Sequence, residues 1–434
     1  MAERKGYRIR VPGLARVEGE GALEIDVQDG AITHLALRIF EPPRLFEKFL
    51  EGHWVGEVPD LVARICGICP VAYQMTAVHA LERLFECDPG PWVAAMRRLF
   101  YCGEWIQSHA LHIHLLAAPD FFGVDSVTGL MEREPEAVKR GFALQRAGNE
   151  ILALLGARSV HPVGARLGGF HRAPAEREVE ALLLRLEALL PEAEETVAWC
   201  ASLQFPQVEQ RFVSVALEEG ERYPFNGGRI LSSEGLAIDP LAWPEHFEEH
   251  QVPHSTALHA TLHGRSYLVG PLARLNLARH RLPPRAAAAL EASGIAFPSA
   301  NLFHSIVARA VELLAAMEEA VELLRAYRPP EGGQPAREWR PRAGVAAWAT
   351  EAPRGVLWHR YEVDGEGRVV AARIVPPTSQ NQGRMEEDLR LSLEALGVDA
   401  GEEAVRHRAE QVVRNYDPCI SCATHFLRVR LTRR

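Results

Sequence analysis

The 434-residue chain contains few cysteines, seven in all, which is an odd number. A secreted domain held together by disulfides needs many paired cysteines, so this sequence predicts a protein of a reducing compartment, the cytoplasm. Long apolar runs are also missing. No stretch approaches the roughly 18 residues of a membrane-spanning helix, and residues 1–12 lack the apolar core of an export signal. We therefore expect no direct membrane span and no export.

An excess of positive charge is absent as well. The 48 Lys and Arg residues are outnumbered by 57 Asp and Glu residues, and the formal net charge of −9 argues against binding to nucleic acid. A Gly-x-Gly-x-x-Gly fingerprint, a P-loop and internal repeats are all missing, which excludes the common nucleotide-binding motifs and solenoids. Hydrophobic residues make up 47% of the chain, which is enough for a large folded core.

The hydrophobic pattern changes along the chain. Residues 7–40 alternate in hydrophobicity around Asp29-Gly30, which predicts a hairpin in a small N-terminal sheet. Apolar residues three and four positions apart predict long helices, and the sequence also predicts a second hairpin and two closing helices. The expected helices cover 61–118, with a long one that begins near Trp92 and stops at Pro119, then 134–157, 175–203 and 301–327; strands are expected near 256–272, and the second hairpin turns at 364–367. The fold class is mainly α with α+β elements.

We interpret the whole chain, 1–434, as a single domain with distinct parts. The parts are a β-rich segment 1–58, a helical bundle 59–328 with a mixed insertion near 205–300, a hairpin and metal-binding segment 340–425, and a possible cleaved extension 426–434. A Pro- and Gly-rich stretch at 329–333 is the expected linker between the bundle and the hairpin.

Four of the cysteines form two Cys-x-x-Cys pairs, in RICGICP (64–70) and DPCISCATH (417–425). Each spacing places two sulfurs on one side of a turn, and two such pairs form a four-thiolate cage for a soft metal ion. Asp417-Pro418 is typical of a helix start, so we expect Cys419 at a helix N-terminus, where a thiolate is stabilised. Spacing alone favours a structural zinc site over a redox pair, because neither pair follows a βαβ pattern.

The two cysteine motifs resemble the signature motifs of the large, catalytic subunit of nickel-iron hydrogenases, and the resemblance extends over essentially the whole chain. It implies a helical bundle with a small N-terminal sheet and a peripheral α/β region. It also implies reversible cleavage of H2 into protons and electrons at a nickel-iron centre whose iron carries CN and CO. Cys66 and Cys419 would be terminal nickel ligands, and Cys69 and Cys422 would bridge nickel to iron. Tyr73 departs from the pattern, because many relatives have His there.

Two further motifs carry the resemblance. ARVEG (15–19) is similar to the motif whose glutamate, here Glu18, carries protons away from a nickel-bound cysteine; without the cysteine motifs Glu18 would be interpreted as a solvated carboxylate. EAPRG (351–355) resembles the motif whose arginine, here Arg354, reaches over the iron. The resemblance implies that Asp120 and Asp417 hold this guanidinium.

The resemblance also implies a structural Mg²⁺ site, with ligands from Glu47 in LFEKFLEG (45–52), from His425 and from the main-chain carbonyl near Ile374. His109 and His112 are interpreted as packing histidines of the helix that leads to Asp120. The remaining cysteines, which stand alone in apolar helical stretches, are interpreted as inert core thiols: Cys87, Cys102 and Cys200.

The predicted second hairpin gives an argument from geometry. With its turn at 364–367, Arg354 lies opposite position 377, so Arg354 and Pro377-Thr378 are expected to be neighbours. In the family a Pro-Ser/Thr pair at this place hydrogen-bonds the iron-bound cyanide. The hairpin would therefore bring together two groups that the chemistry needs.

The lack of any further cysteine cluster implies that electrons leave through an iron-sulfur small subunit. PPTSQNQ (376–382) looks most like the cytoplasmic, NAD(P)-linked multisubunit class, which adds a flavin and NAD(P)-binding subunit and an additional iron-sulfur subunit. The family commonly uses nickel-insertion factors and an endopeptidase that removes the segment after the final His, here 426–434; a retained basic tail is the alternative. The rival functions are a metal-free quinone-site subunit like that of complex I, and a structural zinc protein.

Overall fold

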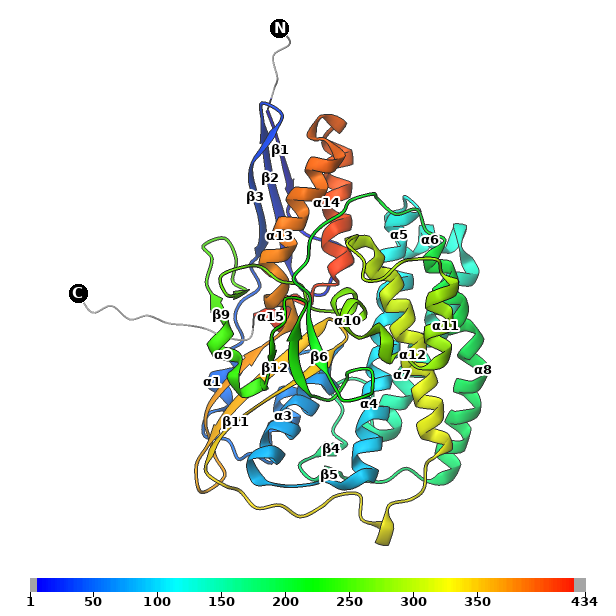
Figure 1. Cartoon of the computed structure of the whole chain (residues 1–434), viewed down its shortest axis with the longest axis vertical. Coiled ribbons are helices and arrows are strands. Elements are labelled where there is room, and N and C mark those ends of the chain that lie inside the picture. The colour runs from blue at the N-terminus through cyan, green and yellow to red at the C-terminus, as the bar shows by residue number, and fades with distance from the viewer. Residues whose placement is uncertain (1–5, 425–434) are drawn as a thin grey trace, which may run out of the picture.

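The computed structural model describes residues 6–424, and its first strands form the predicted hairpin. β1 (Tyr7–Val11), β2 (Gly21–Gln28) and β3 (Ala31–Ile39) make an antiparallel sheet in the order β1-β2-β3. Asp29 and Gly30 have φ of 51° and 79°, the left-handed conformation that a two-residue hairpin turn requires. The sheet projects from one end of the molecule beside two C-terminal helices (Figure 1).

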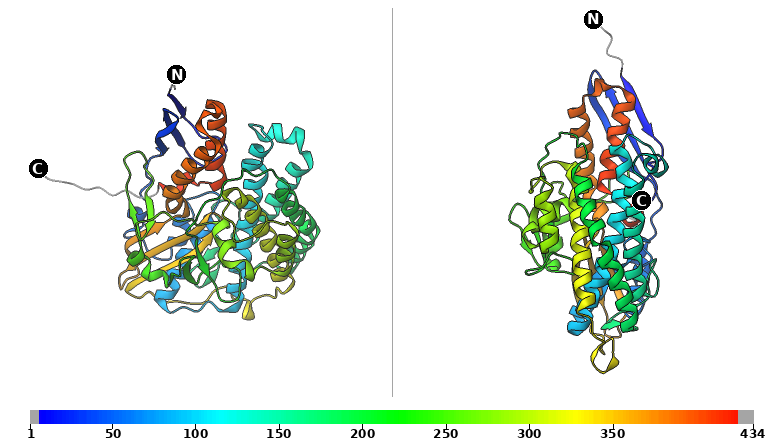
Figure 2. Two further views of the ribbon diagram at one scale, coloured as in Figure 1. Left: turned by 45° about the horizontal axis from the view of Figure 1, so that its top comes forward. Right: turned by 90° about the vertical axis from the view of Figure 1, so that its right-hand side faces the viewer.

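Four long helices form the bundle: α4 (Gly90–Leu111), α7 (Pro135–Gly156), α8 (Glu176–Ala201) and α12 (Ser305–Arg325). They run side by side in the views of Figure 2. α4 and α7 approach closely at Gly103 and Gly148, where a Cβ on Gly148 would lie 2.6 Å from the Gly103 carbonyl oxygen. The helices predicted from 134, 175 and 301 are confirmed.

The helix predicted to stop at Pro119 continues past it. α4 passes into a π-helical segment, η1 (His112–Ala117), and then into α5 (Ala118–Phe121). Pro119 stands in the first turn of α5, where a missing backbone N–H costs no helical hydrogen bond. The expected stop is therefore wrong by a few residues, and the chain turns away only after Phe121.

The second hairpin also forms. β11 (Gly344–Ala352), β12 (Gly355–Val363) and β13 (Val369–Val375) make an antiparallel sheet in that order, and Asp364 Oδ1 accepts hydrogen bonds from two N–H groups in the turn to β13. α3 (Pro70–Phe85) packs against this sheet. The closing helices are α13 (Pro377–Leu396), α14 (Glu402–Tyr416) and the short α15 (Ile420–Ala423).

The stretch between the bundle helices holds short elements. The strands expected over 256–272 are mostly wrong, because only β10 (His259–Leu262) is extended there and α10 (Pro271–Ala278) begins at a proline. The other elements are α1 (Phe46–Leu50), α2 (Val58–Val62), α6 (Val127–Arg133), β4 (Ala165–Arg166), β5 (Gly169–Phe170), β6 (Val215–Glu218), β7 (Arg229–Ser232), β8 (Ala237–Ile238), α9 (Trp243–His246), β9 (Phe247–His250) and α11 (Pro284–Ala292).

The largest hydrophobic core joins the bundle helices to α3 and β12, and it includes both Cys-x-x-Cys pairs. The mainly helical architecture with small sheets agrees with the predicted fold class. Within residues 6–424 we find no helix with both the length and the apolarity needed to cross a membrane.

Candidate metal centre

The two cysteine pairs meet although they lie at opposite ends of the chain. Cys69 is the N-cap of α3 and Cys419 is the N-cap of α15, so each pair wraps the start of a helix. All four side chains are between 1% and 3% exposed, and their Sγ atoms lie within 4.8 Å of one another. The structure thus builds the four-thiolate cage that the spacing predicts.

The sulfurs are close but not bonded. Sγ–Sγ distances are 3.3 Å for Cys66–Cys419, 3.7 Å for Cys69–Cys422 and 2.7 Å for Cys419–Cys422, and all four are free thiols. Hydrogen bonds from the neighbouring thiols hold the pKa of Cys66 well below its usual range, whereas burial raises the pKa of Cys419. Four thiolates at these distances repel one another unless a cation lies among them, so the donor set fits soft metal ions.

The N-terminal half-site, Cys66 and Cys69, is held mainly by helix α4. Glu104 is fully buried and accepts hydrogen bonds from the N–H groups of Val71 (2.6 Å) and Ala72 (3.1 Å), which caps α3 just after Cys69. Burial raises the pKa of Glu104 well above its usual range, and these two donors partly offset that effect. Gln107, one turn further along α4, donates to the Ile68 carbonyl at 2.6 Å.

The C-terminal half-site, Cys419 and Cys422, is held by segments from elsewhere in the chain. Thr378, at the start of α13, accepts a hydrogen bond from the Cys419 N–H at 3.0 Å. Glu18 pairs with Cys419 in an isolated parallel bridge; its carbonyl accepts from the Ile420 N–H and its carboxylate from the Ser421 N–H, each at 3.0 Å. The sequence-predicted Glu18 therefore lies directly beside the cysteine pair.

Arg354 and Asp417 form the predicted ion pair. Arg354 is 3% exposed, and its Nη2 lies 3.1 Å from Asp417 Oδ1 while its Nε donates to the Asp417 carbonyl at 2.8 Å. Burial opposes the ionisation of Asp417, but Arg354, His112 and Arg309 outweigh it and lower the pKa of the carboxyl. Nη1 of Arg354 is buried and has no hydrogen-bond partner within residues 6–424, so one donor remains for a ligand.

The predicted contact between Asp120 and Arg354 is wrong. Asp120 lies at the end of α5 and accepts from Arg16 Nη2 at 2.5 Å and from Arg414 Nη2 and Nε at 2.8 and 2.7 Å. Both of its oxygens are used by these two arginines. Asp120 therefore ties the segment before Glu18 to α14, and Arg354 is held by Asp417.

The predicted hairpin register is also wrong. β12 pairs with β13 as His359↔Ile374, two positions from the expected alignment, and Arg354 lies in the turn between β11 and β12 because Ala352 pairs with Gly355. Arg354 and Thr378 still approach one centre, since the first binds Asp417 and the second binds Cys419. The chain segment 417–419 makes this connection, and strand pairing does not.

Asp417 does not begin a helix as the sequence predicts. It ends α14 in the left-handed conformation with φ of 54°, which Asp tolerates better than most residues. Cys419 then caps the short α15. The chain reverses between these residues, and this reversal brings the Asp417 carboxylate and Cys419 Sγ to the same centre.

The expected Mg²⁺ ligands lie partly within the described residues. Glu47 in α1 accepts a hydrogen bond from the Ile374 N–H at 2.7 Å, which joins α1 to β13. His425, the third expected ligand, lies outside the described residues 6–424. The structure therefore brings Glu47 and Ile374 together, and the presence of the cation stays a prediction.

Sequence reasoning missed several residues that build the centre. Arg44 bonds the carbonyls of Ile65 and Ser421 and thus joins the two half-sites. Arg309 contributes a second charge to Asp417, with Nη1 at 3.5 Å from Oδ2, and burial lowers its pKa to about 10. Glu104 was missed as well. Arg44 stands directly before the motif LFEKFLEG (45–52), but no pattern gave it a role, and the signal for Glu104 and Arg309 was only a charged residue within an apolar helix pattern.

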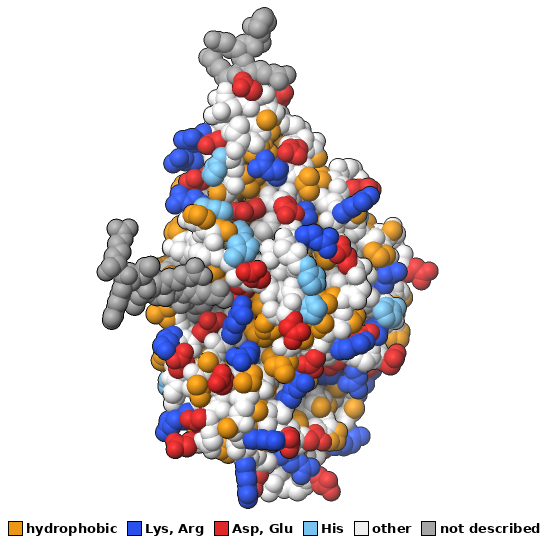
Figure 3. Space-filling model, turned by 60° about the vertical axis from the view of Figure 1, so that its left-hand side comes forward, with side chains coloured by type: hydrophobic (Ala, Val, Ile, Leu, Met, Phe, Trp, Pro, Cys, Tyr) orange, Lys and Arg blue, Asp and Glu red, His pale blue; other side chains and the backbone are white. Residues whose placement is uncertain are grey.

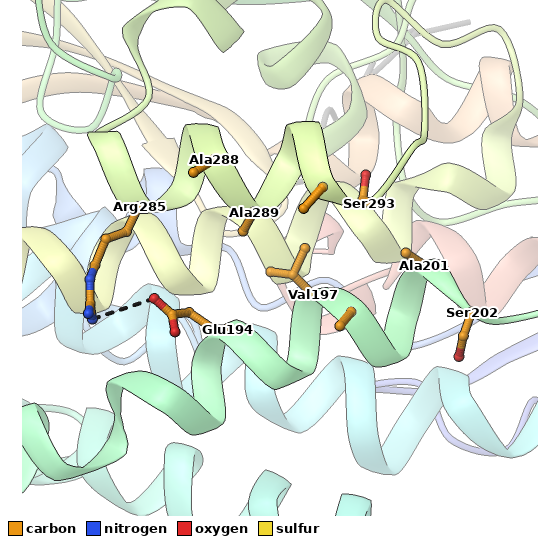
Figure 4. Close-up of a pocket in the computed structure, with 10 residues that line it drawn as sticks. Glu194, Val197, Ala201, Ser202, Arg285, Ala288, Ala289 and Ser293 are labelled. Atoms are coloured by element: carbon orange, nitrogen blue, oxygen red, sulfur yellow. Dashed lines mark ion pairs between the residues drawn. The ribbon is translucent and has the colours of Figure 1, made fainter.

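A separate groove lies between α8 and α11. Small apolar side chains line it, and one ion pair, Arg285 with Glu194 at 3.5 Å, crosses one end (Figure 4). It contains neither thiols nor a buried carboxylate, and its walls are on the bundle edge away from α3 and α15 (Figure 1). The groove is not part of the metal centre.

Comparison with known proteins agrees with this site. The family model of nickel-dependent hydrogenases matches residues 44–140 and 257–425, which include all four cysteines. The chain is 33% identical to the alpha subunit of sulfhydrogenase 1 of Pyrococcus furiosus, over 97% of this chain and 98% of the relative.

Two further relatives have NAD in their names. The beta subunit of the NAD-reducing hydrogenase HoxS of Cupriavidus necator is 28% identical over 97% of this chain and 95% of the relative. The crystal structure of an NAD⁺-reducing [NiFe]-hydrogenase in the H2-reduced state superposes with a TM-score of 0.86 at 30% identity, covering 96% of this chain and 99% of that one. With the four-thiolate cage in place, these matches show that the chain belongs to the nickel-dependent hydrogenase family, oxidoreductases that act on H2.

Proposed function

We propose that this chain is the catalytic subunit of a nickel-iron hydrogenase, in which Cys66, Cys69, Cys419 and Cys422 would hold the nickel-iron centre through their thiolates. The observation that carries the proposal is the buried cage of four free thiols within 4.8 Å, with a buried arginine beside it. When bound, the nickel-iron centre, with CN and CO on iron, supplies the electron-rich site at which H2 is split. Each rival function leaves one feature of the site unexplained. A structural zinc site does not require the flanking Arg354, and a metal-free quinone-site subunit does not require four buried thiols.

The protein's own residues position the reacting groups. Arg354, fixed by Asp417, presents its unpaired Nη1 in a buried site, where one donor stabilises developing negative charge strongly. Pro377 and Thr378 open α13 beside Cys419, which suits the binding of an iron-bound cyanide.

Glu18 is the proposed base that receives the proton. Its carboxylate accepts a hydrogen bond from the N–H of Ser421, which lies between Cys419 and Cys422 in the sequence. The Glu18 side chain is partly exposed. A carboxylate in this place can take a proton from a thiol and release it towards the surface. Asp120 acts through Arg16, which lies two residues before Glu18, so its proposed role is to position this segment.

The proposed hard-cation site uses Glu47, Ile374 and His425 for Mg²⁺. Glu47 already lies against the main chain of Ile374, and carboxylate and carbonyl oxygens with water suit Mg²⁺. A cation there would fix the segment that carries Cys422 to α1 and β13.

We also propose that an endopeptidase removes residues 426–434 after nickel insertion, so that His425 becomes the C-terminus. Intact-mass measurement of active enzyme tests this; a subunit that still ends at Arg434 would exclude cleavage.

Electrons are proposed to leave near Gly67. Gly67 is exposed, although it lies between the buried Cys66 and Cys69 in the sequence. The neighbouring Val160 is 54% exposed. The thiolates thus lie directly beneath the surface here. An iron-sulfur small subunit covering this face would receive the electrons, and a flavin subunit with a further iron-sulfur subunit would pass them to NAD(P) in the cytoplasm.

The decisive experiment is metal analysis of the protein purified with its partners, together with H2-dependent dye reduction. We expect one nickel per chain in addition to iron, and activity that depends on both. Zinc in the four-thiolate cage without nickel would contradict the proposal, whereas a chain without metal and without H2 activity would favour the quinone-site alternative.

A further inference from the structure

A second cluster of metal-ligating side chains lies outside the cysteine centre. His259 is the first residue of β10, His254 lies in the loop between β9 and β10, and Glu386 lies in α13. One donor atom from each residue lies within 4.8 Å of the other two. This side of the molecule is the face shown in Figure 3, on which several histidine side chains gather below the N-terminal sheet.

His259 is the buried member of the cluster. Its side chain is 4% exposed, and its Nε2 has no hydrogen-bond partner within residues 6–424. The ring lies over α13 at Gly383, one turn before Glu386, and its centroid is 5.8 Å from that of His254. The unpaired, buried ring nitrogen is therefore a candidate donor for a metal ion.

Glu386 completes the donor set. Its Oε1 accepts from His254 Nε2 at 2.7 Å and from the Leu37 N–H of β3 at 3.0 Å. Its Oε2 accepts no hydrogen bond from the described part of the chain. If His254 and Glu386 paired only with each other, both this oxygen and the buried Nε2 of His259 would have no partner. An unsatisfied buried nitrogen lowers the stability of the folded state.

We propose that His254, His259 and Glu386 form a second metal site, which takes Zn²⁺ or a similar divalent first-row ion with water as fourth ligand. Two imidazoles and one carboxylate suit such an ion, whereas a Mg²⁺ site is built mostly from oxygen ligands and Cu⁺ prefers sulfur. Zn–N and Zn–O bonds of about 2.0–2.2 Å place the donors of a tetrahedral site about 3.3 Å apart. An ion bound here would replace the 2.7 Å hydrogen bond between His254 Nε2 and Glu386 Oε1.

The ion would join three parts of the fold. His254 and His259 come from the β9–β10 region, Glu386 from α13, and the bond from Leu37 adds β3 of the N-terminal sheet. α13 begins at Pro377 and holds Cys419 through Thr378. The site is therefore a structural one that fixes α13, and it does not depend on the hydrogenase activity proposed above.

The experiment uses the intact enzyme complex, dialysed against Zn²⁺ and then against buffer, with zinc measured by mass spectrometry and zinc K-edge X-ray absorption. The variants are His259→Gln and, because a buried substitution can impair folding, His254→Gln in the partly exposed loop. The matched control is His246→Gln with His263→Gln, which removes a second histidine pair, at the end of α9 and directly after β10, with nitrogens 3.5 Å apart.

We expect one zinc per chain, bound through nitrogen and oxygen at about 2.0–2.1 Å, retained in the control and reduced at least tenfold in both variants. Zinc that enters the cysteine cage would instead show sulfur at about 2.3 Å, so the absorption spectrum distinguishes the two sites. Wild-type enzyme that retains no zinc, or zinc held equally by His254→Gln, would overturn the proposal. Sulfur-only coordination would overturn it as well.

Discussion

Helix α4 holds the N-terminal half-site of the cysteine centre, whereas three distant segments hold the C-terminal half-site. Glu104 and Gln107, one turn apart on α4, bind the chain around Cys69. Around Cys419 the partners are Glu18, Arg44 and Thr378, which come from the segment between β1 and β2, the segment before α1 and the start of α13.

This difference is one of sequence separation. The contacts that support the N-terminal half-site come mainly from α4 and join residues 32 to 39 positions apart, so they close short loops. The contacts that support the C-terminal half-site join residues as far as 403 positions apart. The C-terminal half-site therefore depends on the whole tertiary fold, and the N-terminal half-site depends mainly on the packing of two helices.

The largest expected effect comes from removing one thiolate from either half. Cys66→Ser and Cys419→Ser replace a soft anionic ligand by a neutral hydroxyl, so both should abolish H2-dependent dye reduction. Cys102→Ser, at a buried core thiol outside the centre, is the control. Activity above about a tenth of wild type in either variant would exclude a ligand role for that cysteine.

The next effect concerns the arginine beside the C-terminal half-site. Arg354→Lys should retain nickel and iron but lower turnover on the order of a hundredfold, because an ammonium cannot both bind Asp417 and present a fixed donor at the Nη1 position. Metal content and dye reduction, measured on the same sample, check this. Loss of metal would show that Arg354 has a structural role.

A pH effect is expected at Glu351 in β11, outside both half-sites. Burial raises the pKa of Glu351 to about 7, although Arg274 opposes this, so the folded chain keeps a proton that the unfolded chain releases near its ordinary value of 4.5. This contribution to stability is present below about pH 4.5 and is lost as the pH rises through about 7, on the order of 3 kcal/mol. Urea unfolding across this range should show the loss in wild type and in the exposed-residue control Glu366→Gln, and a flatter profile in Glu351→Gln.

A smaller effect should separate the two half-sites. Glu104→Gln replaces one acceptor oxygen by an amide that donates, so the N–H of Val71 or Ala72 is left unpaired in a buried place. We expect a loss of about 1–3 kcal/mol in the free energy of unfolding. Chemical denaturation of the complex gives the value, and an unchanged midpoint would show that α4 does not support the N-terminal half-site.

The smallest effect on stability should come from Glu18→Gln. The side chain is partly exposed, so the free energy of unfolding should change by less than about 0.5 kcal/mol. H/D exchange with H2 should nevertheless fall, because an amide cannot accept and release the proton. Glu20→Gln, at an exposed neighbour, controls for local charge. Unchanged exchange in Glu18→Gln would exclude it from the proton path.

The sequence predicted some parts of this molecule well. Asp29-Gly30 and the turn after Val363 marked both hairpins, because turn residues act locally, and the spacing of apolar residues marked the bundle helices. The register that was expected to bring Arg354 to position 377 was wrong for two reasons. The alignment of β12 with β13 shifts at Glu362/Val363, next to the turn, and the chain reverses at Pro353-Arg354, so that β12 begins only at Gly355. Turn positions were therefore more reliable than alignments extrapolated from them.

By itself the sequence determined the chemistry: two pairs of soft thiolates, a carboxylate near the N-terminus and an arginine near the C-terminus. These are properties of side chains and of spacing within one turn. Only the tertiary structure decided which charged groups meet. Asp120 pairs with Arg16 and Arg414, Asp417 pairs with Arg354, and Glu104 accepts hydrogen bonds from the start of α3. Buried charges must find partners across elements far apart in sequence, and no local pattern specifies those partners.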